Sequence, residues 1–236
     1  MSDVLVVNGL GRDFGRVRAV DSISFSVAPG EFVGLVGPNG AGKSTTIKLL
    51  TAQLLPTRGS VTVGGVDVVE DPNGARRQLG YVPEDPSLYE YLSAREMVSF
   101  AAELRGASAD EVESVLELAG LGADADRLIR EYSQGMRRKT ALACALVAKP
   151  PLLVLDEALN GLDPPSAARV VGALADACRA GQAVLLSTHV LDTLEKVADR
   201  IVMVAAGRVI ADVGVEELDQ VRGLFTDAPE RQPVSD

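Results

Sequence analysis

The sequence predicts an α/β fold with a mostly parallel sheet, an antiparallel β subdomain and an inserted α-helical subdomain. Apolar runs typical of strands alternate with segments of helical spacing, which favours a parallel sheet covered by helices on both faces. The first section of the chain is rich in strands, whereas residues 87–148 have helical character. A chain of this length buries roughly 70–75% of its unfolded surface, so it needs no disulfide or metal to fold.

The N-terminal section begins with three strands, VLVV, SISFSV and FVGLVG, and the third ends in a glycine-rich turn. A helix is expected from about Lys43 to Leu55, because Pro56 cannot continue it. The pair Gly64-Gly65 predicts a hairpin between SVTV and VDVV. The segment QLGYVP predicts one further short strand.

The middle of the chain contains two S-x-x-E capping boxes, each followed by helical spacing and a glycine stop. In the first helix Ser93 and Glu96 form the predicted capping box and Gly106 is the predicted stop. In the second helix Ser108 and Glu111 form the box and Gly120 is the stop. The segment PLLVLDE predicts a buried strand, and Asp163-Pro164 predict the start of a helix that ends near Gly181. Strands are expected in AVLLST, RIVMVA and RVIADV, and the polar tail TDAPERQPVSD is expected to be mobile.

The composition limits the classes of function. Lys and Arg number 23 against 33 Asp and Glu, a net charge of −10, which disfavours wrapping of nucleic acid. There is no signal-peptide pattern and no run of 18 apolar residues, so we expect a soluble chain that meets a membrane only through a partner. Cys144 and Cys178 lack CxxC spacing, which favours buried free thiols in a reducing cytosol.

GPNGAGKST, at residues 37–45, fits the phosphate-loop pattern G-x-x-x-x-G-K-[ST] without a mismatch and lies between a predicted strand and a predicted helix. Glycines let backbone N–H groups point at phosphate oxygens, and the helix N-terminus adds positive potential. We expect Lys43 to reach the β- and γ-phosphates, Ser44 to ligate Mg²⁺ and Thr45 to contact a phosphate. The predicted nucleotide contacts in this loop are Gly37, Pro38, Asn39, Gly40, Ala41, Gly42, Lys43, Ser44 and Thr45. The motif therefore predicts a P-loop NTPase core of the RecA-like type.

The strand LLVLDE ends in two adjacent carboxylates. By itself such an ending usually means a solvated sheet edge, but beside a phosphate loop it indicates a hydrolytic site. Asp156 is expected to hold Mg²⁺, often through water. Glu157 is expected to polarise a water in line with the γ-phosphate. His189, the single histidine, follows the next strand, and alone it is more typical of a structural residue.

The segment YSQGMRRKTALACAL resembles the signature loop, usually LSGGQ, of the nucleotide-binding subunits of ABC transporters, and the resemblance covers nearly the whole chain. Ser133 and Gly135 match the signature, while Tyr132, Gln134 and Met136 depart from it. In this family the signature of one subunit closes over the phosphate loop of another. The resemblance therefore implies nucleotide contacts at residues 133–135 and a homodimer, or a heterodimer with a second cassette.

The same resemblance assigns roles to four further residues. Asp163 in NGLDP matches the loop that links the two sites, although Ala158-Leu159 replaces the usual Pro-Thr. Phe14 lies where the family has an aromatic ring that stacks on adenine. Glu84 in YVPEDP lies where the family commonly has Gln, and it is a candidate Mg²⁺ ligand. His189 in STHV matches the switch histidine that contacts the γ-phosphate.

The resemblance also implies a division of the chain. The nucleotide-binding core and β subdomain are expected in residues 1–85, the helical signature subdomain in 86–149, the second part of the core in 150–215, and a C-terminal helix with a flexible tail in 216–236.

The combination of YSQGM and VPE resembles single-domain subunits of ABC-2-type exporters, which act with a separate membrane permease. The implied function is a Mg-dependent ATPase with ATP and Mg²⁺ as cofactors, peripheral on the cytoplasmic face of the cell membrane, with no nucleic-acid partner. The implied catalytic residues are Lys43, Glu157 and His189. Tyr89, Tyr91 and Leu92 either form an apolar groove for the permease or belong to the core. The permease chooses the cargo, and the outward direction rests on resemblance alone.

Other classes fit less well. A soluble ABC ATPase of translation or DNA repair usually carries two cassettes, long coiled-coil or zinc inserts, or basic arms, and none is visible here. A P-loop GTPase requires an N-K-x-D-like motif, and NGLD lacks the lysine. A cassette that binds ATP only to regulate its partner is disfavoured by the intact Glu157.

Overall fold

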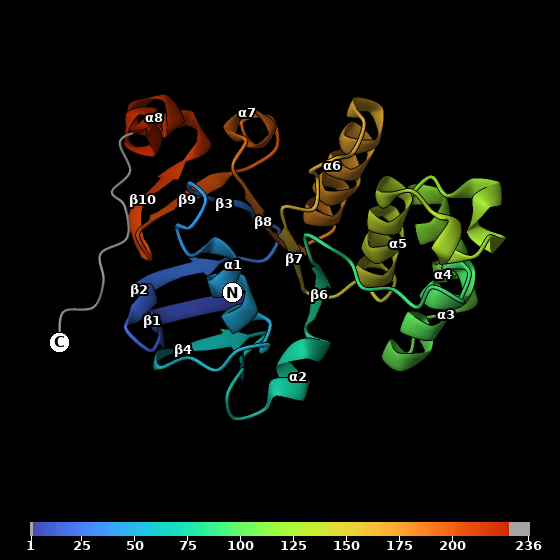
Figure 1. The fold of residues 1–236 in the computed structure, drawn as a ribbon, viewed down its shortest axis with the longest axis horizontal. Coiled ribbons are helices and arrows are strands. Elements are labelled where there is room, and N and C mark those ends of the chain that lie inside the picture. The colour runs from blue at the N-terminus through green and yellow to red at the C-terminus, as the bar shows by residue number, and fades with distance from the viewer. Residues whose placement is uncertain (1, 227–236) are drawn as a thin grey trace.

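The computed structural model, which describes residues 2–226, contains two sheets (Figure 1). The antiparallel sheet has the strand order β2-β1-β4-β5, and the six-stranded sheet has the order β10-β9-β3-β8-β7-β6. The strands are β1 Leu5–Phe14, β2 Val17–Val27, β3 Phe32–Val36, β4 Arg58–Val63, β5 Val66–Asp67, β6 Leu79–Val82, β7 Leu152–Asp156, β8 Ala183–Thr188, β9 Arg200–Ala205 and β10 Arg208–Gly214. In the larger sheet β9, β3, β8, β7 and β6 pair in parallel, and β10 pairs antiparallel to β9. The predicted fold class is confirmed.

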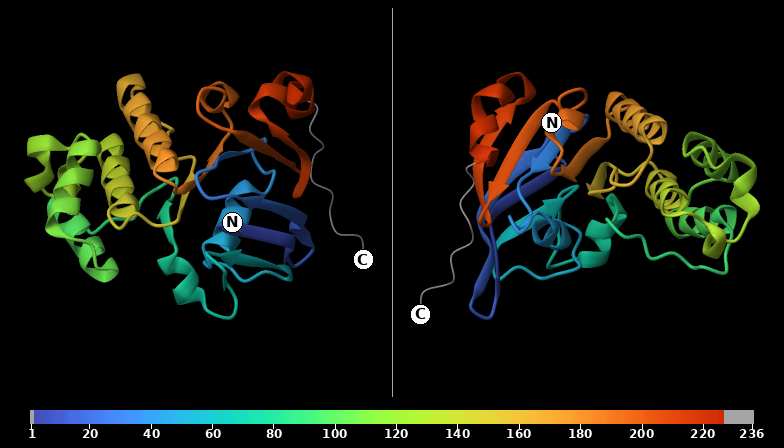
Figure 2. Two further views of the ribbon diagram at one scale, coloured as in Figure 1. Left: turned by 180° about the vertical axis from the view of Figure 1, so that it is seen from behind. Right: turned by 45° about the horizontal axis from the view of Figure 1, so that its top comes forward.

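The helices fall into groups around these sheets. The α-helices are α1 Lys43–Leu50, α2 Pro72–Arg77, α3 Ala94–Arg105, α4 Ala109–Leu118, α5 Gln134–Leu146, α6 Pro164–Arg179, α7 Leu191–Leu194 and α8 Leu218–Thr226. Short 3-10 helices cover Gly122–Asp126, Ile129–Glu131 and Val215–Glu217. Helices α3, α4 and α5 lie together, to one side of both sheets, in all three views (Figures 1 and 2). This group is the helical block that the sequence predicts between β6 and β7.

Two apolar cores hold these layers together. One core packs α1 between the two sheets, and its fully buried members include Ile47 of α1, Leu5 of β1 and Leu35 of β3. The other core joins the opposite face of the larger sheet to α6 and to the helical block, through residues such as Leu174 and Val98. Because the larger sheet is buried on both faces, its central strands β3, β7 and β8 are apolar almost throughout, as parallel strands require.

The capping signals predicted the helix starts correctly. Both capping boxes form, Ser93 with Glu96 on α3 and Ser108 with Glu111 on α4. The Asp163 side chain caps α6 by accepting the backbone N–H of Ser166 at 2.9 Å, and Pro164 is the first helical residue. These contacts satisfy N–H groups that lack a partner within the helix.

Several boundaries differ from the prediction. The helix expected to reach Leu55 ends at Leu50, because the chain turns at Ala52 with φ of 55°. The second hairpin strand ends after Asp67, since the Asp67 carboxylate accepts the backbone N–H of Val69 at 2.7 Å and of Glu70 at 3.2 Å. Helices α2 and α7 were not predicted. Residues 227–236 of the tail that was expected to be mobile lie outside the described residues.

Other side chains also answer sequence-based expectations. Tyr89 and Tyr91 are exposed rather than part of the core, and Leu92 is half-buried. Cys144 and Cys178 are free thiols, half-buried rather than buried, and desolvation raises the pKa of Cys144 to about 12 and of Cys178 to about 11. Within residues 2–226 every helix is too short or too polar to cross a lipid bilayer.

Candidate functional site

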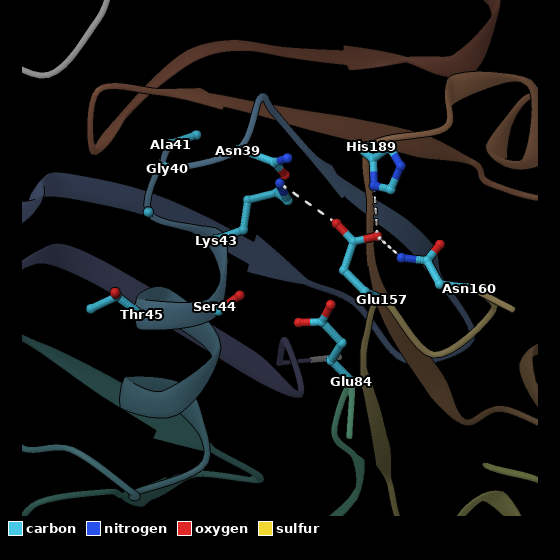
Figure 3. Close-up of a pocket in the computed structure, with 11 residues that line it drawn as sticks. Asn39, Gly40, Ala41, Lys43, Ser44, Thr45, Glu84, Glu157, Asn160 and His189 are labelled. Carbon is cyan, nitrogen blue, oxygen red and sulfur yellow. Dashed lines mark hydrogen bonds and ion pairs between the residues drawn. The ribbon is translucent and has the colours of Figure 1, made fainter. Parts of the chain in front are cut away.

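A polar pocket of about 260 Å³ lies where β3, β7 and β8 of the larger sheet end (Figure 3). Its lining comes from the glycine-rich loop and the start of α1, with side chains from the segments that follow β6, β7 and β8. The lining residues are Asn39, Gly40, Ala41, Gly42, Lys43, Ser44, Thr45, Glu84, Glu157, Asn160 and His189. Ligands bind at the carboxyl ends of parallel strands in this class of fold, so the pocket is placed as a ligand site should be.

The glycine-rich loop, residues 37–42, is held by backbone contacts that permit only glycine at two positions. A Cβ at Gly37 would lie 2.1 Å from the carbonyl oxygen of Val204. Gly42 has φ of 112°, and a Cβ there would lie 2.7 Å from the carbonyl oxygen of Ala19. Strand β3 ends immediately before this loop and α1 begins immediately after it, so the helix N-terminus points its unpaired N–H groups towards the pocket.

Lys43 is 6% exposed, and within the described residues it is the only lysine or arginine that lines the pocket. Its Nζ donates to the carbonyl oxygens of Gly37 at 2.7 Å and of Pro38 at 3.3 Å. The same ammonium lies 3.6 Å from Oε1 of Glu157. A buried cation must be paired, and Lys43 meets this requirement within the loop and across the pocket.

Glu157 follows β7 directly and is 7% exposed. Its φ of 49° is left-handed, which costs a non-glycine residue about 1 kcal/mol or more. Its backbone N–H donates to Ser187 on β8, to the carbonyl oxygen at 3.2 Å and to Oγ at 3.1 Å. Oε2 of Glu157 accepts Nδ2 of Asn160 at 3.1 Å and lies 3.0 Å from Nδ1 of His189. Figure 3 shows the side chains of Lys43, Asn160 and His189 converging on the Glu157 carboxylate.

Asp156, the last residue of β7, is 4% exposed and precedes Glu157, although it does not line the pocket itself. Its Oδ1 accepts the hydroxyl of Ser187 at 2.7 Å. Burial raises the pKa of Asp156, and hydrogen bonds from Ser187 and Ser44 oppose that shift. The hydrogen bond from Ser44 brings its hydroxyl and the Asp156 carboxylate together at the start of α1.

These oxygens fit Mg²⁺ better than a transition metal. No group of three or more His, Cys, Asp and Glu side chains in the described part of the chain is arranged to hold a metal ion. Magnesium instead uses one or two protein oxygens together with phosphate oxygens and waters. Ser44 and Asp156 supply such a pair, and Glu84 brings a third oxygen donor to the same pocket.

Several predicted site residues lie outside this pocket. Ser133 begins α5, where its Oγ accepts the N–H of Met136 at 3.3 Å, and Gln134 and Gly135 form the first turn of that helix. Asp163 is engaged in capping α6. Phe14, at the end of β1, is 44% exposed, and the Arg12 guanidinium lies 4.7 Å from the centre of its ring. The pocket of one chain therefore collects only part of the predicted set.

Sequence reasoning missed two residues of the site. Asn160 lines the pocket and donates to Glu157, but in the sequence it was only one letter of the NGLDP motif. Ser187 contacts both Asp156 and Glu157 from β8. The signal for Ser187 was a polar side chain in the buried run AVLLST, because a buried hydroxyl requires a hydrogen-bonding partner.

Comparison with known proteins agrees with this geometry. The family model described as ABC transporter matches residues 20–160. The daunorubicin/doxorubicin resistance ATP-binding protein DrrA of Streptomyces peucetius is 40% identical over 223 residues, which are 92% of this chain and 67% of that protein. The bacitracin transport ATP-binding protein BcrA of Enterococcus faecalis is 32% identical over 229 residues, 96% of this chain and 74% of that protein.

Solved structures give the same result. The ATP-binding subunit of an ABC transporter superimposes with a TM-score of 0.87 at 34% identity, covering 95% of each chain. The sequence, the fold and the arrangement of the pocket thus point to one family. This chain belongs to the ABC transporter family, as an ATP-binding subunit.

Proposed function

We propose that this chain is the Mg-dependent ATPase subunit of an export-type transporter, which closes head-to-tail on a second cassette when ATP binds and reopens after hydrolysis. One observation supports hydrolysis above all: a nearly buried glutamate at the end of β7 lies 3.6 Å from the loop lysine and 3.0 Å from the single histidine. Glu157 also has a strained left-handed backbone, and strained residues of this kind cluster at functional sites.

Binding of ATP is assigned to the loop at residues 37–45. The backbone N–H groups of the loop and of the first turn of α1 bind phosphate oxygens. Lys43 then exchanges its hydrogen bonds to the carbonyls of Gly37 and Pro38 for bonds to the β- and γ-phosphates. Phe14 stacks on adenine, and its ring is exposed enough to do so.

Hydrolysis is assigned to Glu157 and His189. Glu157 accepts a proton from the water that attacks the γ-phosphorus, while the bond from that phosphorus to the bridging oxygen breaks and its electron pair stays with ADP. His189 contacts the transferred phosphoryl group. Ser44, Asp156 and Glu84 are the candidate ligands of Mg²⁺, which supplies positive charge at the β- and γ-phosphate oxygens when bound.

A second cassette completes each site. The N-terminus of α5, with Ser133, Gln134 and Gly135, has the N–H groups and the hydroxyl needed to bind a phosphate. Those groups do not line the pocket of their own chain, which supports a role across a dimer interface. Asp163 lies on the loop that leads from Glu157, the proposed general base, to α6. We assign it to contact between the two sites.

A membrane permease is the proposed partner, and nucleic acid is not. The net charge of −10 disfavours nucleic acid, and the names of DrrA and BcrA refer to drug resistance and bacitracin transport. Tyr89 and Tyr91 are exposed before α3, and Tyr89 packs edge-on against Phe100 at 6.3 Å between ring centres. We assign this exposed aromatic surface to the permease, and we assign the subunit to the cytoplasmic face of the membrane.

The test is capture of partners from membranes of the native host. The tagged chain is purified after gentle solubilisation, and the captured proteins are identified by mass. A polytopic membrane protein in stoichiometric amount is the expected result, and a Tyr89→Ala, Tyr91→Ala double variant should capture less of it. Capture of ribosomal or DNA-associated proteins only would overturn the transport assignment, although the ATPase chemistry would stand.

A further inference from the structure

We propose that Asn160 is a positioning residue for hydrolysis: it fixes one carboxylate oxygen of Glu157, so that the other oxygen receives the proton. The inference rests on the proposed role of Glu157 as the base and assigns different tasks to its two oxygens. Asn160 lies in the pocket beside His189 and Glu157, with its amide nitrogen directed at the carboxylate (Figure 3).

A tight turn brings Asn160 back over the glutamate. The backbone N–H of Asn160 donates to the carbonyl oxygen of Glu157 at 3.0 Å, which closes a turn over residues 157–160. From that turn, Nδ2 of Asn160 donates to Oε2 of Glu157 at 3.1 Å. Since the turn begins at the strained Glu157 and leads into the linking loop, both the backbone and the side chain of Asn160 restrict the carboxylate.

The two oxygens of Glu157 have different surroundings. Oε2 lies 3.1 Å from the amide of Asn160 and 3.0 Å from Nδ1 of His189. A carboxylate oxygen offers about two lone-pair sites, so the Asn160 amide and the His189 tautomer with its hydrogen on Nδ1 together fill Oε2. Oε1 lies 3.6 Å from Lys43, which is an ion-pair distance rather than a short hydrogen bond. The oxygen that can accept a proton without losing an existing hydrogen bond is therefore Oε1.

Lys43 gives this arrangement a dependence on ATP. Without nucleotide its ammonium faces Oε1, so a cation stands on the side of the carboxylate that is to receive the proton. When Lys43 turns to the phosphates, Oε1 is left facing the pocket while Asn160 and His189 still hold Oε2. In the transfer step the O–H bond of the attacking water breaks, its proton moves to Oε1, and the water oxygen forms the new bond to phosphorus.

The test compares two substitutions of Asn160. Asn160→Ala removes the donor. Asn160→Asp keeps the size and shape of the side chain but replaces the donor by an acceptor of the same charge as Glu157. Asn160→Ala should lower kcat about tenfold, the usual effect of losing a hydrogen bond to a charged group, with KM for ATP changed less than about twofold. Asn160→Asp should lower kcat further. Asn73→Asp, at an exposed position of α2, is the matched control for the added charge and should leave kcat unchanged.

A second measurement separates positioning from a structural role of the turn. In a Glu157→Gln background, Asn160→Ala should cause no further loss of the residual turnover, because its effect passes through the base. The double variant should still form the ATP-bound dimer. A wild-type kcat in Asn160→Asp would overturn the inference. So would an equal fold-loss of turnover when Asn160→Ala is introduced into the wild type and into Glu157→Gln. Failure of the proposed function is recognised by a different result: Glu157→Gln alone would then turn over ATP at the wild-type rate.

Discussion

Replacement of Glu157 by Gln separates binding from hydrolysis at this site. The change keeps the shape of the side chain but removes a charge that lies 3.6 Å from Lys43. At an effective dielectric constant of about 20, that charge pair is worth about 4–5 kcal/mol. Because both side chains are nearly buried, the substitution leaves the Lys43 ammonium without its counter-charge. The protein without nucleotide should therefore lose up to about 3–5 kcal/mol of stability, reduced by the hydrogen bonds that Lys43 keeps to the carbonyls of Gly37 and Pro38.

The substitution also changes how tightly ATP binds and how fast it is hydrolysed. With Gln at position 157, Lys43 no longer divides its charge between a carboxylate and a phosphate, so ATP should bind at least as tightly as to the wild type. The proton acceptor is lost, and general-base catalysis contributes typically about 10²–10⁴-fold, equivalent to about 3–5 kcal/mol of barrier. We therefore expect kcat to fall by at least about 100-fold.

Phosphate release at saturating ATP measures kcat, and light scattering during size exclusion measures dimer formation. The variant should elute as a stable dimer in ATP and as a monomer without it. Glu103→Gln, an exposed position on α3, is the control and should behave as wild type. Turnover within about threefold of the wild type would remove Glu157 from the role of base, since that ratio is under 1 kcal/mol.

Three further substitutions test the loop, the metal side of the pocket and the helical block. Gly37→Ala places a Cβ against the backbone oxygen of Val204, so it should abolish tight ATP binding and destabilise the fold by about 1–3 kcal/mol; unchanged titration and melting curves would refute the loop geometry. Glu84→Gln replaces a charged candidate ligand of Mg²⁺ by a neutral one, so the Mg²⁺ concentration that gives half-maximal ATPase activity should rise about threefold, and an unchanged value would contradict the metal role of Glu84. Hydrogen bonds from Ser108 lower the pKa of Glu111 from 4.5 to about 2, so the ionised carboxylate stabilises the fold above pH 4.5 and that contribution is lost as the pH falls towards 2. Glu111→Gln should therefore melt at a lower temperature than wild type at neutral pH, with a gap that narrows below pH 4.5; a gap that does not depend on pH would refute this cause.

Much of the fold could be predicted because its signals are local. Ser93 and Ser108 start helices through side-chain bonds that depend on residues three positions away, and Asp163-Pro164 works in the same way. Asp71-Pro72 carries the same signal before α2 and was overlooked, although the Asp71 side chain accepts the N–H of Gly74. The strand order is different in kind: β3 lies between β8 and β9, and no local pattern encodes that pairing.

The residues of the site also fall into those that local motifs predict and those that depend on tertiary contacts. Residues 37–45, Asp156 and Glu157 belong to short motifs whose spacing carries their chemistry. Asn160 and Ser187 act through single hydrogen bonds that depend on where a turn and a neighbouring strand place them. The left-handed backbone at Glu157 is also a product of the tertiary contacts of that turn, because glutamate has no intrinsic preference for it. Such contacts become visible only in the folded chain.

The composite site is the central claim, and mixing two inactive chains tests it most directly. One chain carries Lys43→Ala and an intact signature. The other carries Gly135→Asp, which puts a carboxylate where a phosphate should bind but fits the first turn of α5, since a Cβ there meets only ordinary contacts.

Each variant alone should be inactive. In the mixture, random pairing makes about half of the dimers mixed, and each mixed dimer has one intact site, which is about a quarter of the wild-type rate. A mixture as inactive as its components would contradict the claim, because it would mean that the phosphate loop and the signature act within one chain.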